Sequence, residues 1–260
     1  MSILQAIILG IMQGATEFLP VSSSGHLVLL QKIFGIAEGT LLFDTMTHVG
    51  TLTAVFVVLW KDIWAILKKP FQPLTGFLII ATVPTVIIAL IFKDAIEKAF
   101  TSAGFLGWAF LLTSLALVVS DFLANRGENA SGQFRQMDAV DALVIGILQA
   151  IAVVPGVSRS GFTLSGALAR RLDKDSAARF SFLLSIPVIL GALILQIKDL
   201  AGGNAVHMEI APLIAGILTA AFVGFLSVRL MIRLVKRHRL WGFAIYTGLL
   251  GIAVLVFGIQ

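Results

Sequence analysis

Long apolar stretches separated by short polar ones run along most of this chain. Six of them approach about 20 residues, the length that an α-helix needs to cross the hydrocarbon core of a bilayer. They cover residues at about 41 to 60, 74 to 92, 103 to 123, 176 to 197, 209 to 232 and 240 to 259. The pattern therefore predicts six membrane-spanning helices, the second of which contains Pro84.

Two further apolar segments are interrupted by polar residues and turn formers. The first, residues 3 to 37, is broken by Glu17 and by the turn from Pro20 to Gly25, and the second covers residues 139 to 171. Neither offers an unbroken apolar stretch of about 20 residues. Irregular backbone is tolerated at membrane depth only where it is buried in protein or lines a polar cavity. Both segments are therefore predicted to be re-entrant helical hairpins.

The two broken segments also match each other at a fixed spacing, the 136 positions that separate Gly10 from Gly146. The identities pair Gly10-Ile11 and Gln13 with Gly146-Ile147 and Gln149, and Val21-Ser22, Ser24 and Gly25 with Val157-Ser158, Ser160 and Gly161. Three spans and one hairpin in each half make an odd number of crossings, so the second half is predicted to be inverted relative to the first. Inverted repeats with broken helices near the midplane are one way in which membrane proteins build a binding site.

Composition agrees with this plan. Hydrophobic residues make up 58% of the chain, charged residues only 13%, and the mean hydropathy is +1.00. These values are typical of an all-α polytopic membrane protein, because a soluble domain of 260 residues has no interior large enough for so much apolar sequence. We expect one integral membrane domain over 1–260, with repeat halves at about 1–123 and 139–260 and a polar linker at 125–138. The absence of cysteine excludes disulfides, thiolate metal sites and cysteine nucleophiles.

The positions of Lys and Arg predict the orientation. Three, two, four and five of the nineteen lie in the loops at 61–73, 124–138, 170–179 and 229–239, whereas those at 93–102 and 198–208 together hold three. By the positive-inside rule, the loops rich in Lys and Arg are cytoplasmic. Both termini are then outside, the first hairpin enters from the periplasmic face and the second from the cytoplasmic face. The net charge of +5 is explained by these loops, so no nucleic-acid partner is expected.

The first hairpin carries chemistry that is expensive in a membrane, because an ionised group at bilayer depth costs at least about 3 kcal/mol. Its polar residues are Gln13, Glu17, Ser22, Ser23, Ser24 and His26. Gln13 and Glu17 are four residues apart and share one helix face. His26 titrates near neutral pH and is a candidate general base or nucleophile. Ser23 is the alternative nucleophile, since it lies in the same turn.

The second hairpin carries a cation where the first has Ser23. Arg159 offers a planar fork that matches phosphate oxygens. Further donors come from Ser158, Ser160, Thr163 and the amides of a helix that is expected to start at about Gly161. Together the two hairpins indicate a phosphate site that faces an acid–base pair.

Each of these features also has a structural explanation. Gly10, Gly14, Gly161 and Gly166 are small enough to be helix-packing positions. Serine hydroxyls often satisfy backbone groups at the tip of a hairpin, and a buried Glu–His pair can be a structural hydrogen bond. Asp44 and His48, four residues apart, either line the same cavity or join neighbouring helices. Arg159 has the weakest structural explanation, because an arginine at depth needs an anionic partner.

Two motifs carry a family resemblance. One is Gln13-x-x-x-Glu17 followed by Pro20-x-Ser22-Ser23-x-Gly25-His26, and the other is Pro155-Gly156-x-Ser158-Arg159-Ser160-x-x-Thr163. In order and spacing they resemble the two signatures of the bacitracin-resistance protein family of undecaprenyl-diphosphate phosphatases, and the resemblance covers essentially the whole chain. The family pattern admits Gln13 at its first acidic position, which argues against a mechanism that needs two ionised carboxylates.

The resemblance implies hydrolysis of undecaprenyl diphosphate to undecaprenyl phosphate and phosphate, which recycles the lipid carrier of peptidoglycan synthesis and confers bacitracin resistance. Its functional positions correspond to Glu17, Ser23, His26, Ser158, Arg159 and Thr163. With the reading of the two hairpins, we expect catalytic roles for Glu17, Ser23, His26 and Arg159, and substrate binding by Gln13, Ser22, Ser24, Ser158, Ser160 and Thr163. The resemblance also implies a divalent cation, Mg²⁺ or Ca²⁺, for which the sequence offers Glu17 as a candidate ligand; Glu17 could instead orient His26 or take a proton. The expected location is the cell inner membrane among its lipids, with a site that faces the periplasm and a homodimer as one assembly to consider.

Two other functions compete with this reading. The acid-phosphatase-like superfamily of lipid phosphatases also uses a Ser-Gly-His turn, but Ser165 stands where its later histidine would fall, and its upstream Lys-x6-Arg-Pro is missing. A polyprenyl-phosphate transporter or flippase is the stronger alternative, because inverted repeats around a midplane site are what alternating access needs.

Overall fold

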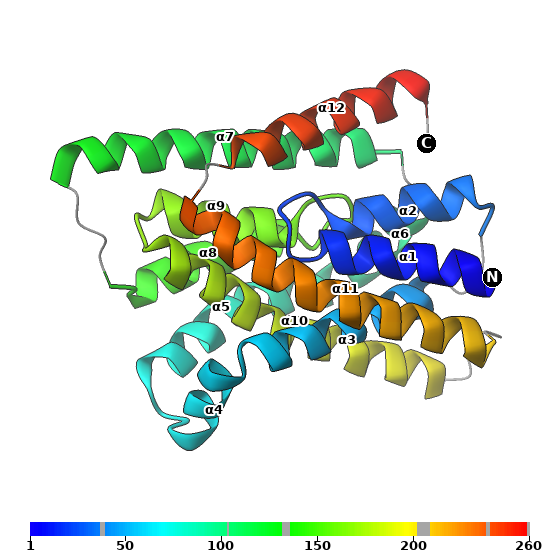
Figure 1. The fold of residues 1–260 in the computed structure, drawn as a ribbon, viewed down its shortest axis with the longest axis horizontal. Helices are drawn as coiled ribbons and strands as arrows, with labels where there is room; N and C mark the ends of the chain where they lie inside the picture. The colour runs from blue at the N-terminus through cyan, green and yellow to red at the C-terminus, as the bar shows by residue number, and fades with distance from the viewer. Residues whose placement is uncertain (37–39, 103, 132–135, 202–208, 238–239, 259–260) are drawn as a thin grey trace.

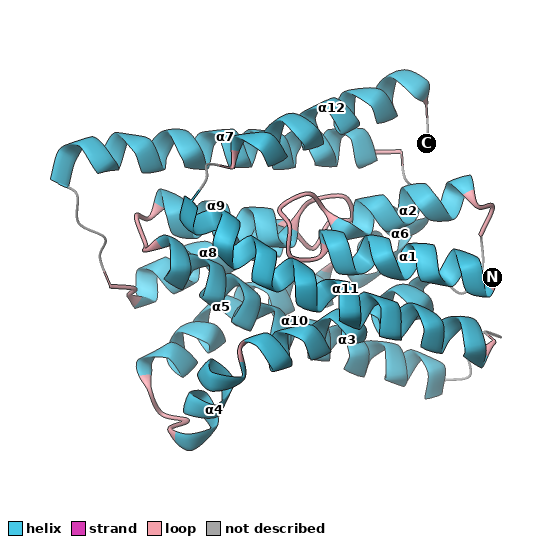
Figure 2. Cartoon of the chain, viewed as in Figure 1, coloured by secondary structure: helices cyan, strands magenta, loops and turns pink. Residues whose placement is uncertain are grey.

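The computed structural model describes residues 1–36, 40–102, 104–131, 136–201, 209–237 and 240–258, and every regular element within them is an α-helix (Figures 1 and 2). The first half contains α1 (Ile3–Thr16), α2 (Ser23–Ile33), α3 (Thr40–Val58), α4 (Trp60–Lys68), α5 (Pro73–Ile91), α6 (Lys93–Ser102) and α7 (Leu106–Ser131). The second half contains α8 (Ala139–Ile151), α9 (Arg159–Ala169), α10 (Lys174–Ala201), α11 (Ile210–Arg237) and α12 (Trp241–Phe257).

Five of the described helices are long and apolar enough to cross a membrane. They comprise Thr40–Val58, Pro73–Ile91, Leu106–Ala124, Lys174–Lys198 and Ile210–Lys236, in α3, α5, α7, α10 and α11. The prediction of an all-α, multi-pass membrane protein is therefore confirmed. The expected sixth span corresponds to α12, an apolar helix of 17 residues. This length lies at the lower limit of about 17 residues for a transmembrane helix, so the sixth span stays a prediction.

Three connections expected as loops are wrong in detail, because helix continues into them. The connection at 61–73 contains α4, whose Trp60 and Trp64 lie four residues apart and stack at 5.5 Å. The connection at 93–102 is α6. The polar linker expected at 125–138 begins inside α7, which continues to Ser131. A single glycine such as Gly127 costs a helix only about 1 kcal/mol and does not end it. Residues 132–135 of this linker lie outside the described residues.

The two broken segments fold as pairs of short helices. α1 and α2 have 14 and 11 residues, and α8 and α9 have 13 and 11. At 1.5 Å per residue, each is about 21 Å long or less, too short to cross a bilayer core of about 30 Å. Capping boxes start both segments, from Ser2 with Gln5 in α1 and from Asp138 with Asp141 in α8. The same 136-residue spacing relates these two caps.

Glycines bring the hairpins into close contact with the long helices of the opposite half. A Cβ atom on Gly10 of α1 would stand 2.6 Å from the carbonyl oxygen of Gly216 in α11. A Cβ atom on Gly146 of α8 would stand 2.5 Å from the carbonyl oxygen of Ala81 in α5. The interpretation of Gly10 as a helix-packing position is confirmed, and its repeat equivalent Gly146 has the same role.

We expect Gly146→Ala to lower the melting temperature of the purified protein in detergent. The new methyl group meets backbone rather than a movable side chain, and overpacking of this kind costs about 1 to 3 kcal/mol. Gly191→Ala is the matched control, because no atom lies within 4 Å of the added Cβ in α10. Equal melting temperatures for the two variants would contradict the close packing of α8 on α5.

The arrangement of helix ends separates two ends of the molecule. In Figure 1 the described chain begins and ends at the right-hand end, where α10 also ends and α11 begins. The end of α7, the start of α8, the end of α11 and the start of α12 lie at the opposite end, as does α4. The two turns that interrupt the hairpins meet near the centre (Figure 2).

Candidate active site

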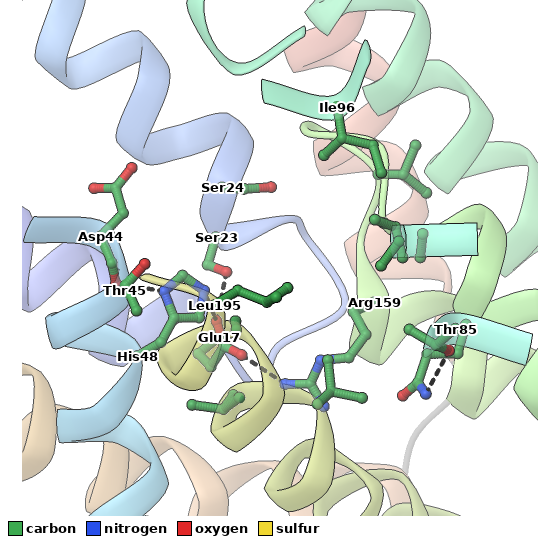
Figure 3. A pocket seen from close by; sticks show the side chains of 18 of the residues that line it. Glu17, Ser23, Ser24, Asp44, Thr45, His48, Thr85, Ile96, Arg159 and Leu195 are labelled. Atoms are coloured by element: carbon green, nitrogen blue, oxygen red, sulfur yellow. Dashed lines mark hydrogen bonds and ion pairs between the residues drawn. The ribbon is translucent and has the colours of Figure 1, made fainter. Parts of the chain in front are cut away.

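The turns of the two hairpins contact each other directly. The amide of Gly156 donates to Ser24 Oγ at 3.1 Å, and Ser160 Oγ donates to the carbonyl oxygen of Leu19 at 2.9 Å. Beside them lies a cavity of about 290 Å³. Side chains from both turns and from α3, α5, α6, α8 and α10 line it, so residues far apart in the sequence share one site (Figure 3).

Glu17 is the centre of this site. It follows the last residue of α1 and is only 5% exposed. One carboxylate oxygen, Oε2, accepts hydrogen bonds from Gln13 Nε2 at 2.9 Å and Ser23 Oγ at 2.6 Å. His48 Nε2 lies 3.3 Å from the same oxygen, and Arg159 Nη2 lies 2.5 Å from the other. A buried carboxylate is tolerated as the anion only when it is paired and hydrogen-bonded in this way.

Ser23 is placed as a nucleophile would be. It is the first residue of α2, directly after Ser22, whose φ of 72° lies in the region that L-residues rarely adopt. This turn points Ser23 Oγ at the Glu17 carboxylate, and the hydroxyl lines the cavity. A carboxylate that accepts the proton of a serine hydroxyl is the arrangement that activates an oxygen nucleophile.

Arg159 faces Glu17 from the opposite hairpin. It is the first residue of α9, so this helix starts two residues before the expected Gly161. Its Nη2 donates to Glu17 and its Nη1 to the carbonyl oxygen of Ser181 at 3.5 Å. The N-terminal ends of α2 and α9 both border the cavity through Ser23, Ser24 and Arg159. Helix N-termini and a guanidinium together favour an anion at this place.

His26 does not line the cavity. Its Nδ1 lies 2.6 Å from the carbonyl oxygen of Ser22, and its Nε2 lies 2.7 Å from the hydroxyl of Tyr246 in α12. The imidazole also stacks on the Tyr246 ring at 5.7 Å and packs edge-on against Phe110. His26 and Ser23 are therefore close in the sequence, as expected, but the imidazole of His26 points toward α7 and α12 and away from the cavity.

The remaining predicted residues divide into two groups. Ser24, Ser158 and Ser160 line the cavity, whereas Gln13, Ser22 and Thr163 do not. Ser22 and Ser158 are the N-caps of α2 and α9. Their hydroxyl oxygens accept hydrogen bonds from the amides of Gly25 and Gly161, the third residues of these helices. Thr163 donates to the carbonyl oxygen of Arg159 and pairs with Ser181 Oγ at 2.6 Å. Ser22 and Thr163 therefore support the site from outside the cavity lining, whereas Ser158 both caps α9 and lines the cavity.

Several cavity residues lie outside the two motifs. Asp44 and His48 line the cavity from α3, which was one of the two alternatives for this pair. Gln149 and Thr85 were not predicted, and Gln149 Nε2 donates to Thr85 Oγ1 at 2.9 Å. The sequence repeat could have indicated Gln149, because this residue is the equivalent of Gln13 in the second half. Thr85 lies in a long apolar stretch and had none.

The donor set does not fit a resident divalent cation. Among the described residues, no group of three or more His, Asp and Glu side chains could hold a metal ion. Glu17, the expected ligand, has both carboxylate oxygens occupied by donors, one of them the cation of Arg159. A resident Ca²⁺ takes about six to eight oxygen ligands, whereas Mg²⁺ held by one or two carboxylates takes its other ligands from substrate phosphates and water.

The helices and the cavity thus define a multi-pass helical membrane protein with a buried polar cavity, in which Glu17 contacts both Ser23 and Arg159. Comparison with known families identifies the group within this class. The model of the family described as bacitracin resistance protein BacA matches residues 6–253, and the chain belongs to this family.

Relatives from several organisms match almost the full chain. The undecaprenyl-diphosphatase of Carboxydothermus hydrogenoformans is 44% identical over 258 residues, which cover 98% of this chain and 97% of the relative. Undecaprenyl-diphosphatase 4 of Bacillus thuringiensis subsp. konkukian is 46% identical, with coverage of 98% and 97%. The undecaprenyl-diphosphatase of Methanosphaera stadtmanae is 39% identical, with coverage of 100% and 99%.

Proposed function

We propose that this chain is an undecaprenyl-diphosphatase, which hydrolyses undecaprenyl diphosphate to undecaprenyl phosphate and phosphate. The names of the relatives and their coverage of both chains support this activity. The observation that carries it is the contact of Glu17 with both Ser23 and Arg159 inside one cavity. In the cell the reaction would recycle the lipid carrier of peptidoglycan synthesis and confer bacitracin resistance, in accord with the family.

The geometry supports a two-step displacement. Arg159 and the amides at the start of α9 hold the terminal phosphate. Ser23 Oγ attacks the terminal phosphorus while its proton passes to Glu17, and the bond to the bridging oxygen breaks to release undecaprenyl phosphate. A water molecule then attacks the phosphorus of the phosphoserine, the bond from Ser23 Oγ to phosphorus breaks, and Glu17 returns its proton to Ser23 Oγ. The oxygen and both hydrogens of the water leave with the phosphate as H₂PO₄⁻. Phosphoryl transfer depends mainly on such positioning and charge stabilisation.

Between the two candidate nucleophiles, the contacts favour Ser23. Its hydroxyl reaches both Glu17 and the cavity, whereas both ring nitrogens of His26 are directed elsewhere. His26 keeps a place in the proposal as a positioning residue. Its contact with the carbonyl of Ser22 holds the positive-φ turn that presents Ser23.

The divalent cation is proposed to enter with the substrate. A diphosphate supplies the oxygen ligands that Mg²⁺ prefers, and Mg²⁺ sites often consist of substrate phosphates with one or two carboxylates. This placement agrees with a protein whose described residues offer no cluster of metal ligands of their own.

We further propose a single domain of two inverted halves in the cell inner membrane, with the cavity facing the periplasm. The repeat is supported by the equivalent capping boxes at Ser2 and Asp138 and by the equivalent contacts of Gly10 and Gly146. The orientation is supported by the positive loops, because α4 and the ends of α7 and α11 lie at the end opposite Met1 (Figure 1).

Cysteine labelling tests this orientation without background, since the chain has no native cysteine. We expect an impermeant maleimide to label Phe257→Cys in intact cells and to leave Phe71→Cys unlabelled until the membrane is opened. Both side chains are exposed, so accessibility on the molecule itself is matched. If only Phe71→Cys is labelled in intact cells, the proposed orientation is wrong and the opposite one holds. The positive-inside rule also predicts Gly203 and Gln260 on the periplasmic side, but neither is among the described residues.

Phosphate release by the purified protein tests the activity and separates it from transport. In detergent there are no two compartments, so a flippase has no measurable function, whereas a phosphatase releases one phosphate from each undecaprenyl diphosphate. We expect release in detergent that is lost in Ser23→Ala. Lipid translocation in vesicles without phosphate release would overturn the proposed function and favour the transporter.

A further inference from the structure

His48 is the imidazole that faces the cavity. It lies in α3 on the same side as Asp44 and Thr45, next to Glu17 and Ser23 in Figure 3. Its Nδ1 lies 2.6 Å from the backbone carbonyl oxygen of Asp44, one turn earlier in the same helix. Its Nε2 lies 3.3 Å from Glu17 Oε2. The bond to its own helix fixes the ring, so that the second nitrogen is directed at the carboxylate.

These two contacts determine where the hydrogens of His48 lie. A backbone carbonyl can only accept, so Nδ1 must carry a hydrogen. A carboxylate also only accepts, so a neutral ring would present a lone pair to Glu17 at 3.3 Å. The contact with Glu17 is an ion pair when Nε2 carries a hydrogen as well, because the ring is then a cation.

Four other ionisable side chains line the cavity. They are Glu17, Asp44, Lys93 and Arg159. The Asp44 carboxylate accepts from Gln31 Nε2 at 2.6 Å, and the ring of His48 meets Asp44 through its backbone. The residues of α10 that line the cavity are Val188, Ile189, Ala192, Leu195 and Gln196, none of which is ionisable.

We propose that His48 is a positioning residue of the reaction, which holds the Glu17 carboxylate in the orientation that accepts the proton of Ser23. This inference rests on the proposed function. Arg159 pairs with Oε1, and His48 lies against Oε2. Gln13 and Ser23 also donate to Oε2, but both are neutral. Without His48, Arg159 is the one cation left against the carboxylate among the described residues, and its pull on Oε1 turns the carboxylate away from Ser23.

Two substitutions of His48 separate the effect of its N–H group from the effect of its size. His48→Leu removes the donor, and His48→Gln supplies an amide N–H of similar reach. We expect His48→Leu to lower kcat about 10-fold or more with KM changed less than about 3-fold, as for a lost partner of a buried carboxylate. His48→Gln should keep more than about a third of the kcat. Thr53→Val is the control in α3, because this exposed hydroxyl bonds only to its own helix at Val49.

A double-mutant cycle tests whether His48 acts through Glu17. In the Glu17→Gln background, His48→Leu should cause no further loss, since the group that it positions is already gone. Equal kcat values for His48→Leu and His48→Gln, or additive losses in the cycle, would overturn the role of His48. If the residual rate of Glu17→Gln is too low to measure, the comparison of the two His48 variants decides alone. Normal turnover in Ser23→Ala and Glu17→Gln would instead overturn the proposed function.

Discussion

Replacing Arg159 by lysine is expected to lower turnover at least about 100-fold, although the positive charge is retained. The guanidinium donates to Glu17 with Nη2 and to the carbonyl of Ser181 with Nη1, and its remaining N–H groups are left for a phosphate. A planar fork can bridge the carboxylate and two phosphate oxygens at once, whereas an ammonium acts as a point charge. The expected loss is the size observed when one transition-state donor is removed.

Arg170→Lys is the matched control for this substitution. Arg170 directly follows α9 and pairs with the buried Asp141 at 2.6 Å, outside the cavity. We expect Arg170→Lys to keep turnover within about 3-fold, as for a partly exposed ion pair. If Arg159→Lys keeps more than about a third of the wild-type rate, the arginine only neutralises the charge of the headgroup and does not bind two phosphate oxygens at once.

The second large effect is expected for Glu17→Gln. The substitution removes the group that accepts the proton of Ser23, and general acid–base help contributes roughly 100-fold to 10,000-fold. The new amide would also place an N–H group among donors, since Gln13, Ser23 and Arg159 all donate to the carboxylate. Kinetic measurements should therefore be accompanied by the melting temperature in detergent, which separates lost chemistry from lost folding.

Asp62→Asn provides the comparison for loss of a negative charge. Asp62 lies in α4 and accepts from Arg179 at 2.8 Å, in a partly exposed ion pair remote from the cavity lining. We expect its turnover to remain close to wild type. A Glu17→Gln variant with near-normal kcat and an unchanged melting temperature would remove Glu17 from the mechanism.

The motifs were sufficient to predict which polar residues of the two turns lie together, because within each turn these residues are local in the sequence. Glu17 and Ser23 are six residues apart around one turn, and Arg159 occupies the equivalent turn of the repeat. The interruption of apolar sequence at these turns also predicted that α1, α2, α8 and α9 are too short to span. Both predictions rest on the free-energy cost of polar groups inside a membrane, because such groups persist there only where they have partners.

The directions of side chains could not be predicted, because they depend on packing between distant helices. His26 lies three residues after Ser23, yet its imidazole contacts Tyr246, 220 positions away. His48 and Asp44 have the spacing of a side-chain pair, but the ring bonds to the Asp44 backbone and reaches Glu17. Hydropathy did not distinguish α4 from a loop; it is a helix of nine residues in which the rings of Trp60 and Trp64 stack.

The stereochemical course at phosphorus tests the central claim, that Ser23 attacks the substrate within this cavity. Each in-line displacement inverts the configuration of phosphorus, so a phosphoserine intermediate followed by water gives net retention. Undecaprenyl diphosphate with a chiral, isotopically labelled terminal thiophosphate, hydrolysed in ¹⁷O-water or ¹⁸O-water, reports the outcome without accumulation of an intermediate. We predict thiophosphate of retained configuration. Inversion would show that water attacks directly, and would contradict the role of Ser23 as the nucleophile.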